Sequence, residues 1–328
     1  FSQKKGDGNF IIKGTAIKKF AFATATDTTF TISVKKAPNF PKQKTEKTYV
    51  EISPLMVNVA DMNGATDSAK YDNARSLIKN AGGGTVYFGG RNFQISKSIE
   101  LASNMKLIID NCGIETTAGQ HDNIIRTPVM VDPNAIYGMA LGAELTENFE
   151  VKGIGNAYLK KISPLKIGDV YGWRGITMLI ANAKNYRVTD LKIIDSPMWS
   201  ISNEWSSYGY FENIEFATNL TNGDGLNFRN GCNNMRAKTL RGFTNDNGVA
   251  LTGMVFTNPQ YPAQVLGWGF DTDNGIRDIH ISDVDMTTKY GTVGIISTGV
   301  EISNVFIADV IERRTGSNIW YVLGIGAN

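Results

Sequence analysis

The stretch NGDGLNF, residues 222–228, returns 23 positions later as NDNGVAL, residues 245–251. Both begin with a run of Asn, Asp and Gly, the residues that favour tight turns. Both continue with two apolar residues separated by one position, which is the spacing of a strand that is buried on one face. A turn and a strand that recur at an interval of this length predict a fold built from stacked repeats.

The interval extends along the second half of the chain. A template of three apolar residues, spaced by three and then by two positions, recurs from residue 151 to residue 307. Its matches begin at Val151, Val188, Phe211, Met235, Ile281 and Ile302; the match at Val151 is incomplete, and Lys238 interrupts the one at Met235. Ile281 lies 46 positions after Met235, which is twice the interval of the opening stretches, so we interpret this span as two coils.

Few folds combine short strands with a repeat of this length. A leucine-rich repeat has a similar length, but it requires a fixed framework of Leu and Asn that this chain lacks. A β-sandwich needs hairpin turns and would not hold one register over so long a segment. The sequence therefore predicts an all-β fold, a right-handed parallel β-helix of about eight or nine coils.

One segment near the start of the repeats has the apolar spacing of a helix. Asp67 is its expected N-cap, and three glycines at positions 82–84 end it. The residues expected on its buried face are Ala74, Leu77, Ile78 and Ala81. We expect this helix, residues 67–81, to cover the N-terminal end of the β-helix, because that end would otherwise expose unpaired strand groups.

The first 50 residues differ in composition from the rest. They contain ten lysines, three acidic residues and no arginine, and apolar and polar residues alternate over residues 18–36. This pattern predicts a small β-rich appendage in residues 1–45, a boundary near residues 40–50 and the β-helix in residues 46–328. Scattered lysines without arginine do not favour nucleic-acid binding, because arginine is the usual reader of bases and phosphates.

Composition and spacing exclude several other classes. No apolar run approaches the roughly 18 residues of a membrane span. Cys112 and Cys232 lie far apart without metal-ligand spacing, so we expect two buried thiols rather than a disulfide. Neither His121 nor His280 stands at a motif position, and a structural role is expected for His280, which lies on a repeat strand. The sequence predicts neither a metal nor a cofactor.

The aspartates of the two opening stretches are offset by one position. Asp224 aligns with Asn247, whereas Asp246 aligns with Gly223. Residues one coil apart lie roughly 4.8 Å from each other in a parallel β-helix, so Asp224 and Asp246 should lie on adjacent rungs. Two such carboxyls can act as acid and base in the cleavage of a glycosidic bond, and their repulsion would raise the pKa of one of them. Aspartates beside Asn and Gly are also common turn residues, so a structural role is the alternative.

The coils around these aspartates resemble a known family. The segment RGITMLIANAKNYRVTDLKIIDSPMWSI, residues 174–201, resembles the coils before the active site of polygalacturonase-like glycoside hydrolases, including its Ser-Pro-x-Trp sequence. Residues 222–224 then stand at the Asn-Thr-Asp motif of that family, and residues 246–247 stand at its Asp-Asp motif. The segment GGGTVYF, residues 82–88, resembles the entry to the pectate-lyase-like β-helices found in many phage tailspikes. The resemblance covers roughly residues 57–310.

This resemblance implies a role for each aspartate. Asp246 matches the general acid of the family, and Asp224 matches one of the aspartates that activate water for an inverting displacement. The second water-activating aspartate is replaced by Asn247, which leaves a single base.

The remaining motifs of the family are changed. Gly-Trp-Gly at residues 267–269 stands at the Gly-His-Gly motif, and Val293 and Ile295 stand where the family has cationic residues. The loss of these cations argues against galacturonate in the central subsite, and Trp268 suits stacking on the apolar face of a neutral sugar. The residues expected to bind substrate are Asn227, Asn247, Trp268, Asp271 and Asp273.

These observations favour a glycoside hydrolase, an endo-acting depolymerase of a bacterial capsular or O-antigen polysaccharide. The resemblance implies a phage tailspike that assembles as a homotrimer, in the virion tail or otherwise extracellular. The alternatives are a secreted pectinase-like glycosidase, a non-catalytic glycan-binding β-helix and a polysaccharide lyase. We rank the lyase below the hydrolase because it requires a uronate and usually Ca²⁺ or a basic residue, and no basic residue stands at the predicted site. We expect no nucleic-acid partner and no membrane insertion.

Overall fold

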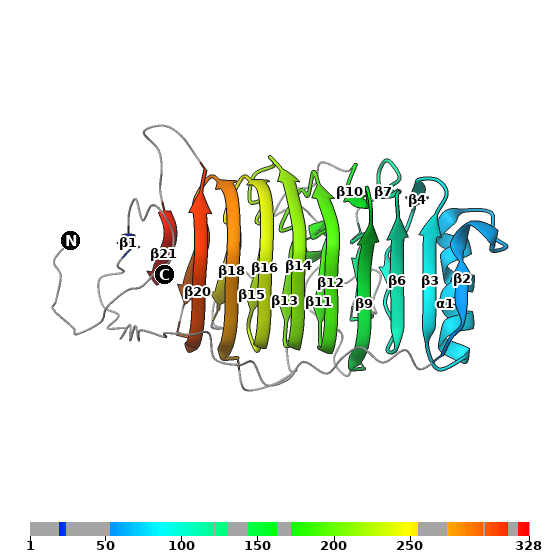
Figure 1. Ribbon diagram of the computed structural model, residues 1–328, viewed down its shortest axis with the longest axis horizontal. Coiled ribbons are helices and arrows are strands. Elements are labelled where there is room, and N and C mark those ends of the chain that lie inside the picture. Colours follow the sequence, from blue (N-terminus) through cyan, green and yellow to red (C-terminus); the bar gives the residue numbers. More distant parts are fainter. Residues whose placement is uncertain are drawn as a thin grey trace.

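The computed structural model describes residues 20–23, 53–120, 122–129, 144–162, 172–254, 274–297, 299–313 and 321–327. These residues form a right-handed parallel β-helix, as predicted. Successive coils stack side by side along one axis, and each coil adds a strand to the sheets that form its walls (Figure 1). We call the strands and turns that one coil contributes a rung.

Two sheets run the length of the molecule, and we name them by their strand numbers. The strands of the nine-stranded sheet, in spatial order, are β1 (Phe20–Ala23), β21 (Tyr321–Ala327), β19 (Gly291–Ser297), β17 (Val249–Gly253), β15 (Leu226–Arg229), β13 (Ile201–Glu204), β11 (Met178–Ala181), β8 (Ile125–Arg126) and β5 (Ile99–Glu100). The main strands of the twelve-stranded sheet are β2 (Met56–Asn58), β3 (Gly84–Gly89), β6 (Met105–Asp110), β9 (Thr146–Ile154), β12 (Ala183–Ile194), β14 (Ser207–Thr218), β16 (Asn233–Thr244), β18 (Ile276–Thr288) and β20 (Ile302–Glu312). Its side strands are β4 (Phe93–Ile95), β7 (Gly113–Thr116) and β10 (Tyr158–Lys160).

Side chains alternate between the core and the outer face along each strand, as the period of a strand requires. On β15, Leu226 and Phe228 are fully buried in the core, so that Asn227 between them points to the outer face. Across the interior, Phe228 meets Phe211 of β14 in an edge-to-face contact with ring centroids 5.7 Å apart. The two sheets are thus held together by side chains that repeat from rung to rung.

The pairing of strands confirms the interval seen in the opening stretches. Leu226 pairs with Val249, and the ladder continues to Arg229 and Thr252. The two stretches are therefore equivalent parts of adjacent rungs.

The predicted pair of coils between Met235 and Ile281 is wrong. Met235 pairs directly with Ile279, and Ala237 pairs directly with Ile281, so that one long coil, rather than two, separates β16 from β18. Residues 255–273 of this coil lie outside the described residues. Met235 and Ala237 both point into the core, so the template of apolar positions can be aligned with this strand from either residue.

Two other repeat assignments are shifted by the same ambiguity. Phe211 pairs with Ala237, a longer step than the predicted one to Met235. Ile281 pairs with Ile307, again a longer step, where the template had aligned it with Ile302. The repeat is therefore less regular than the template suggested.

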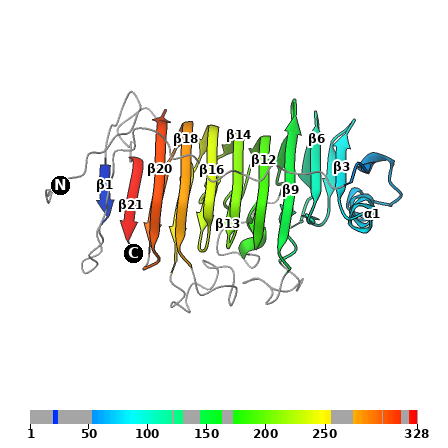
Figure 2. The same cartoon turned by 60° about the horizontal axis from the view of Figure 1, so that its bottom comes forward.

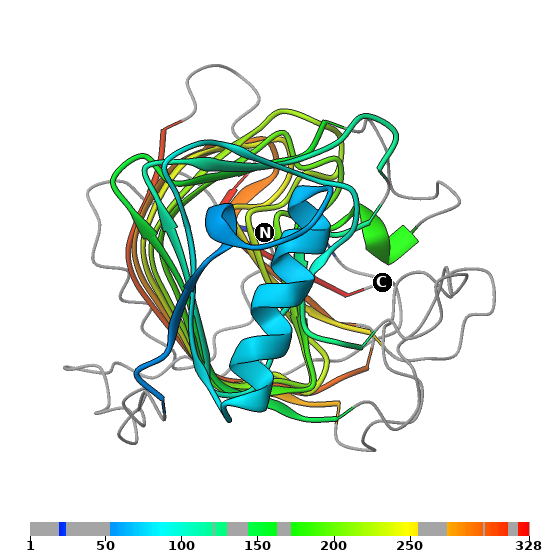
Figure 3. The ribbon, with the colours of Figure 1, turned by 90° about the vertical axis from the view of Figure 1, so that its right-hand side faces the viewer.

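The predicted capping helix is present as α1 (Asp67–Asn80), and it lies across the N-terminal end of the coil (Figure 3). A one-turn helix, η1 (Val59–Asp61), precedes it. The N-cap is Thr66 rather than Asp67, since the Thr66 side chain accepts a hydrogen bond from the backbone N–H of Ala69. The predicted buried face is corrected in part: Leu77 is 47% exposed and Ala81 is exposed, whereas Ala74 and Ile78 are buried as predicted.

The core face of α1 includes two of the four predicted residues, Ala74 and Ile78, together with Tyr71. All three side chains are buried against the first rungs. Asp67 does not cap the helix. It forms an ion pair with Arg91 at 2.5 Å and accepts a hydrogen bond from the backbone N–H of Gln94. These contacts fasten the cap to the first coils.

The N-terminal segment contributes a strand at the opposite end of the molecule. Strand β1 pairs in parallel with β21, the last strand of the chain (Figure 2). The rest of residues 1–52 lies outside the described residues, so the appendage in residues 1–45 and its boundary remain predictions. Both cysteines are buried and free, which confirms the prediction for them. Among the described residues, no helix is both long and apolar enough to cross a membrane.

Candidate active site

Asp224 and Asp246 lie in the turns that lead into β15 and β17. These turns belong to the edge of the nine-stranded sheet that is formed by the N-terminal ends of its strands. Backbone pairing extends beyond the strands into these turns, where Gly225 donates to the carbonyl of Asn247 at 2.9 Å. The turn before β15 is possible because Asn222 adopts a left-handed conformation with φ of 59°, which Asn tolerates well. The predicted neighbourhood of Asp224 and Asn247 is therefore present.

Asn247 binds both carboxyl groups. Its backbone N–H donates to Oδ1 of Asp224 at 3.0 Å, and its side-chain Nδ2 donates to Oδ1 of Asp246, also at 3.0 Å. The carboxyl groups of Asp224 and Asp246 also share a hydrogen bond. The two aspartates thus lie together on adjacent rungs, and we call them the acid pair.

The two members of the acid pair differ in exposure and in proton affinity. Asp224 is only 5% exposed, and Asp246 is partly exposed. Burial, and then the charge of Asp246, raise the pKa of Asp224 well above its usual range, against the opposing effect of the Asn247 N–H. Burial raises the pKa of Asp246 to about 6, and the N–H of Asn247 and the hydrogen bond with Asp224 oppose the rise. Both carboxyl groups of the acid pair therefore bind a proton more tightly than an ordinary aspartate does.

Several polar side chains surround Asp224 on the outer face of β13 and β15. Asn227 is fully buried, and its amide lies beside Asp224, where it lowers the pKa of that carboxyl. Ser202, which pairs with Asn227 on the neighbouring rung, is also fully buried, and its hydroxyl has no hydrogen-bond partner in the described part of the chain. Asn227 therefore lies next to the acid pair and is not exposed for contact with a substrate.

A buried ion pair extends this polar layer. Arg229 of β15 binds Glu204 of β13 at 2.8 Å, with both side chains nearly inaccessible to solvent. The ring of Trp199 lies 4.3 Å from the guanidinium of Arg229, a distance typical of a cation–π contact. Arg229 also lowers the pKa of Asp224 through its charge. Sequence reasoning missed this group, although Glu204 and Arg229 occupy outward positions at the ends of paired strands.

The rung after Asp246 differs from the prediction. Strand β17 pairs directly with β19, so that the turn at Tyr290 is the one that follows Asp246 on the next rung. Residues 267–269, which were expected there, lie outside the described residues. Val293 is fully buried in the core and Ile295 packs against it, so neither can occupy a substrate-facing position. The outward residue between them is Gly294, where a Cβ would lie 2.7 Å from Oδ1 of Asn247.

The expectation that the site lacks basic residues is wrong. The charge of Lys289, in the turn before β19, lowers the pKa of Asp246, and Arg229 acts in the same way on Asp224. A search for the family's cationic motif missed both, because neither stands at the motif positions.

Three predicted substrate-binding residues cannot be placed. Trp268, Asp271 and Asp273, like His121, lie outside the described residues. His280 lies on the outer face of the twelve-stranded sheet, where its ring packs against Phe306. Among the described residues, no group of three or more His, Cys, Asp and Glu side chains could hold a metal ion.

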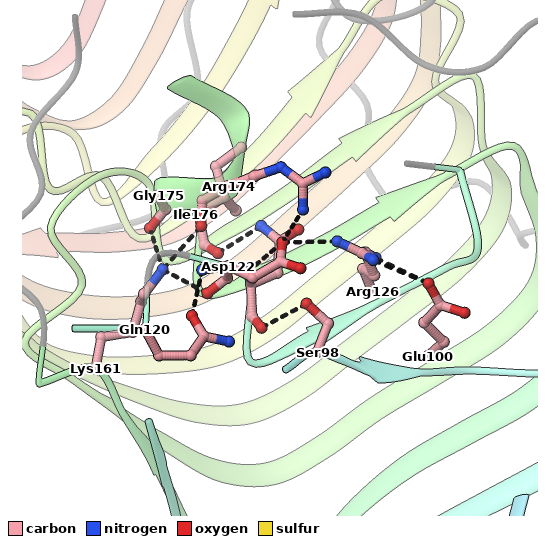
Figure 4. A network of polar contacts seen from close by, with 10 residues as sticks. Ser98, Glu100, Gln120, Asp122, Arg126, Lys161, Arg174, Gly175 and Ile176 are labelled. Carbon is pink, nitrogen blue, oxygen red and sulfur yellow. Dashed lines mark hydrogen bonds and ion pairs between the residues drawn. The ribbon is translucent and has the colours of Figure 1, made fainter. Parts of the chain in front are cut away.

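A second polar network lies at the same edge of the nine-stranded sheet, three rungs toward α1 (Figure 4). Asp122 binds Arg126 at 2.6 Å and Arg174 at 2.9 Å, and Arg126 also binds Glu100 at 2.9 Å. Arg174 belongs to the one-turn helix η2 (Gly172–Gly175). Asp122 precedes Ile125 by three positions, as Asp246 precedes Val249, but spacing alone did not reveal the network.

The side chain of Lys161 also belongs to this network. Its ammonium group donates to the backbone carbonyls of Asp122 at 2.9 Å, Arg174 at 2.8 Å and Gly175 at 3.2 Å. Burial lowers the pKa of Lys161 to about 7. Because the arginines and carboxylates of the network neutralise one another, we interpret it as a clamp between turns rather than as a catalytic centre.

Comparison with known proteins identifies relatives by fold only. The chain matches no protein-family model and no curated protein sequence. Among solved structures it is similar to a hyperthermoactive exopolygalacturonase from Thermotoga maritima, with 15% identity, 84% of this chain and 80% of that chain covered and a TM-score of 0.54. It is also similar to a polygalacturonase from Erwinia carotovora ssp. carotovora, with 14% identity, 87% and 78% coverage and a TM-score of 0.53.

A third similar structure is described as an adhesin. It is PfbA of Streptococcus pneumoniae, a surface adhesin, with 14% identity, 81% of this chain and 65% of that chain covered and a TM-score of 0.52. At such low identity, these similarities establish the right-handed parallel β-helix and leave the activity to be argued from the site.

Proposed function

We propose that this chain is a glycoside hydrolase that cleaves the backbone of a polysaccharide with Asp224 and Asp246 as its acid and base. The observation that carries the proposal is the acid pair itself. The pKa of both carboxyl groups is raised, and that of the more accessible Asp246 is about 6. A general acid works best when its pKa lies near the working pH.

The exposure of the two carboxyls assigns their roles in the bound state. Asp246 is the more exposed member and can reach the glycosidic oxygen, which supports the assignment of Asp246 as the acid. Below its pKa of about 6, Asp246 carries the proton that the glycosidic oxygen receives. The mutual repulsion of two neighbouring carboxylates favours a state in which one of them is protonated.

The hydrolytic step then balances within the acid pair. Asp246 gives its proton to the leaving oxygen as the bond from that oxygen to the anomeric carbon breaks, and the oxygen keeps the electron pair. Water attacks the anomeric carbon and loses a proton to the carboxylate of Asp224. The cycle ends with Asp224 protonated and Asp246 ionised, and proton exchange with the solvent returns Asp246 to its protonated form and Asp224 to its ionised form.

The wider biological role is part of the same proposal. We infer an endo-acting depolymerase of a bacterial capsular or O-antigen polysaccharide, acting outside the cell as a homotrimeric phage tailspike. The β-helix fold, which this chain shares with two polygalacturonases, supports a polysaccharide substrate. Light scattering tests the assembly, since a monomer contradicts the trimer and favours a secreted glycosidase.

Activity on defined polysaccharides tests the chemistry. The protein is incubated with a panel of capsular and O-antigen polysaccharides, and the products are analysed by mass. Hydrolysis adds one water to each cleaved bond, and Asp246→Asn should lower the rate by roughly 10²–10⁴-fold. Undiminished turnover by that variant would refute the role of Asp246.

Two alternatives each have one observation in their favour. Asn247 replaces a carboxyl of the family motif and donates to both aspartates, which favours a non-catalytic glycan-binding site. In that case glycans bind without any change in mass. The charge of Lys289 near Asp246 favours a lyase, whose unsaturated products absorb in the ultraviolet and lack the added water.

A further inference from the structure

The exposed aromatic side chains of the molecule gather beside the acid pair. Among the residues whose side chains the structure describes, only two aromatic rings are exposed, Phe243 at 43% and Tyr290 at 50%. Phe243 lies near the C-terminal end of β16, three residues before Asp246, and Tyr290 lies in the turn before β19. The remaining aromatic side chains in that part of the chain are buried or half-buried. We call Phe243 and Tyr290 the aromatic pair.

The strand register places Tyr290 next to Asp246. Val249 of β17 pairs with Val293 of β19, and the pairing continues into the turns before the two strands. Three residues back from each valine, Tyr290 stands at the position of Asp246 on the next rung, roughly 4.8 Å away along the axis. The charge of Lys289, the residue before Tyr290, lowers the pKa of Asp246. This effect is independent evidence that the turn of Tyr290 lies beside the proposed acid.

Phe243 approaches Asp246 within the same coil. The residue before Phe243 pairs with Phe216, which is fully buried, so Phe243 points to the outer face. Three residues of chain limit the distance between the Cα atoms of Phe243 and Asp246 to about 11 Å. Phe243 also pairs with Thr287, on the strand that leads to Tyr290. One ring of the aromatic pair therefore lies on the rung of Asp246, and the other lies on the next rung.

The surface around the aromatic pair is polar. Arg241, on the same face of β16, binds Asp283 at 2.6 Å. The side-chain amide of Asn245 donates to a backbone carbonyl at 2.6 Å, and the ammonium nitrogen of Lys289 lies 5.8 Å from the centroid of the Tyr290 ring. The core of a protein–protein interface is usually apolar and depleted of charged residues. Single aromatic rings among charged and hydrogen-bonding side chains fit a sugar better, because a sugar offers both C–H groups and hydroxyl groups.

We propose that Tyr290 and Phe243 stack on pyranose residues of the polysaccharide and hold its glycosidic oxygen at Asp246. A pyranose whose C–H groups gather on one face offers an apolar surface to an aromatic ring. Tyr290 stands on the rung after Asp246, where the sequence placed Trp268, so stacking is assigned to a residue that no motif indicated. The position of the scissile bond at Asp246 is taken from the proposed hydrolysis, on which this assignment rests.

Saturation-transfer-difference NMR tests the contact without turnover. The probes are the methyl glycosides of glucose, galactose, mannose and N-acetylglucosamine, each with the wild-type chain. At least one probe should receive saturation, most strongly at its ring C–H protons. Tyr290→Ser and Phe243→Ser should each weaken binding by roughly two- to tenfold, whereas Tyr290→Trp should retain it. The matched control is Leu77→Ser, because Leu77 is 47% exposed but lies on α1. The control should bind as the wild type does.

The Asp246→Asn variant separates this assignment from the proposed hydrolysis. That variant should bind the methyl glycoside as the wild type does, because stacking does not require the acid. On a polysaccharide that is cleaved, Tyr290→Ser should raise KM more than it lowers kcat. Cleavage with an unchanged kcat/KM in Tyr290→Ser would overturn the aromatic pair and leave the hydrolysis standing. Binding through the aromatic pair without cleavage of any polysaccharide would leave the aromatic pair standing and contradict the hydrolysis.

Three further results would overturn the role of the aromatic pair. The first is that none of the four probes receives saturation. The second is that Phe243→Ser together with Tyr290→Ser binds the probe as tightly as the wild type. The third comes from light scattering: if this double variant dissociates an oligomer that the wild type forms, the two rings belong to an interface between copies of the chain. Both positions are exposed, so the substitutions should leave the fold intact.

Discussion

Asn247 donates its backbone N–H to the carboxyl group of Asp224, one rung below, at 3.0 Å. The same residue donates its side-chain amide to Asp246. A neutral residue at this position therefore bridges two carboxyls that would otherwise repel each other, and its two donor groups hold them close together on adjacent rungs.

Asn247→Asp should raise the pKa of Asp246 above about 6. The substitution replaces the Nδ2 donor with an oxygen and adds a third carboxyl to the acid pair, so repulsion makes ionisation less favourable. NMR titration of the carboxyl carbons measures this change without a substrate. If the protein hydrolyses a polysaccharide, the limb of its pH–rate profile that reports Asp246 should move in the same direction. An unchanged or lower pKa of Asp246 would contradict the bridging role of Asn247.

Asp246→Asn should stabilise the protein at alkaline pH. The pKa of Asp246 is about 6 in the folded chain and about 4 in the unfolded chain. A raised folded pKa contributes stability that is complete below pH 4 and is lost as the pH rises through 6. The variant cannot ionise, so its stability relative to the wild type should increase by roughly 1–2 kcal/mol between pH 4 and pH 8.

Thermal unfolding at several pH values measures that difference. The matched control is Asp195→Asn, because Asp195 is exposed and has a left-handed conformation, with φ of 53°, that Asn also tolerates. The control should change stability little. Equal pH profiles for the two variants would show that Asp246 titrates like a surface carboxyl.

Part of this site could be predicted because the register of a β-helix follows from its inward residues. Leu226 and Val249 recur at one interval, and that interval places Asp224 and Asp246 on adjacent rungs. The raised pKa of Asp224 could not be predicted, since it depends on how deeply Asp224 is buried and on the opposing charge of Arg229. Both effects arise from packing around the turn, which no motif records.

The errors in the prediction have a common physical origin. Inward side chains recur at every second residue of a strand, so an apolar template cannot tell Met235 from Ala237. The same alternation explains why Val293 and Ile295, which were aligned with the cationic residues of the family, point into the core. A residue points to the same side of its strand as the residue with which it pairs on the neighbouring rung. The prediction assigned the wrong pairing partner where it counted one long coil as two.

Ile78→Ala should destabilise the N-terminal end of the molecule much more than Leu77→Ala. Ile78 is fully buried between α1 and the first rungs, whereas its neighbour Leu77 is 47% exposed. Removal of a buried isoleucine side chain typically costs about 2–5 kcal/mol, because a cavity remains. Chemical denaturation compares the two variants. Similar losses from both would mean that α1 does not pack on the coil through its Ile78 face.

Lys161→Met should destabilise the clamp between turns, and the loss should depend on pH. Lys161 donates to three backbone carbonyls, which the methionine leaves without their donor, at a cost of about 1–3 kcal/mol. The pKa of Lys161 is about 7 in the folded chain and about 10.4 in the unfolded chain. The unfolded chain therefore binds more protons between these values, so the wild type gains stability as the pH rises from 7 to 10. The variant lacks this gain, and the gap between the two proteins should widen over that range. Thermal unfolding at pH 6, 7, 8 and 9 measures the gap, with Lys160→Met, at the adjacent and less buried position, as the control. A gap that stays constant with pH would show that Lys161 remains fully charged in its buried position.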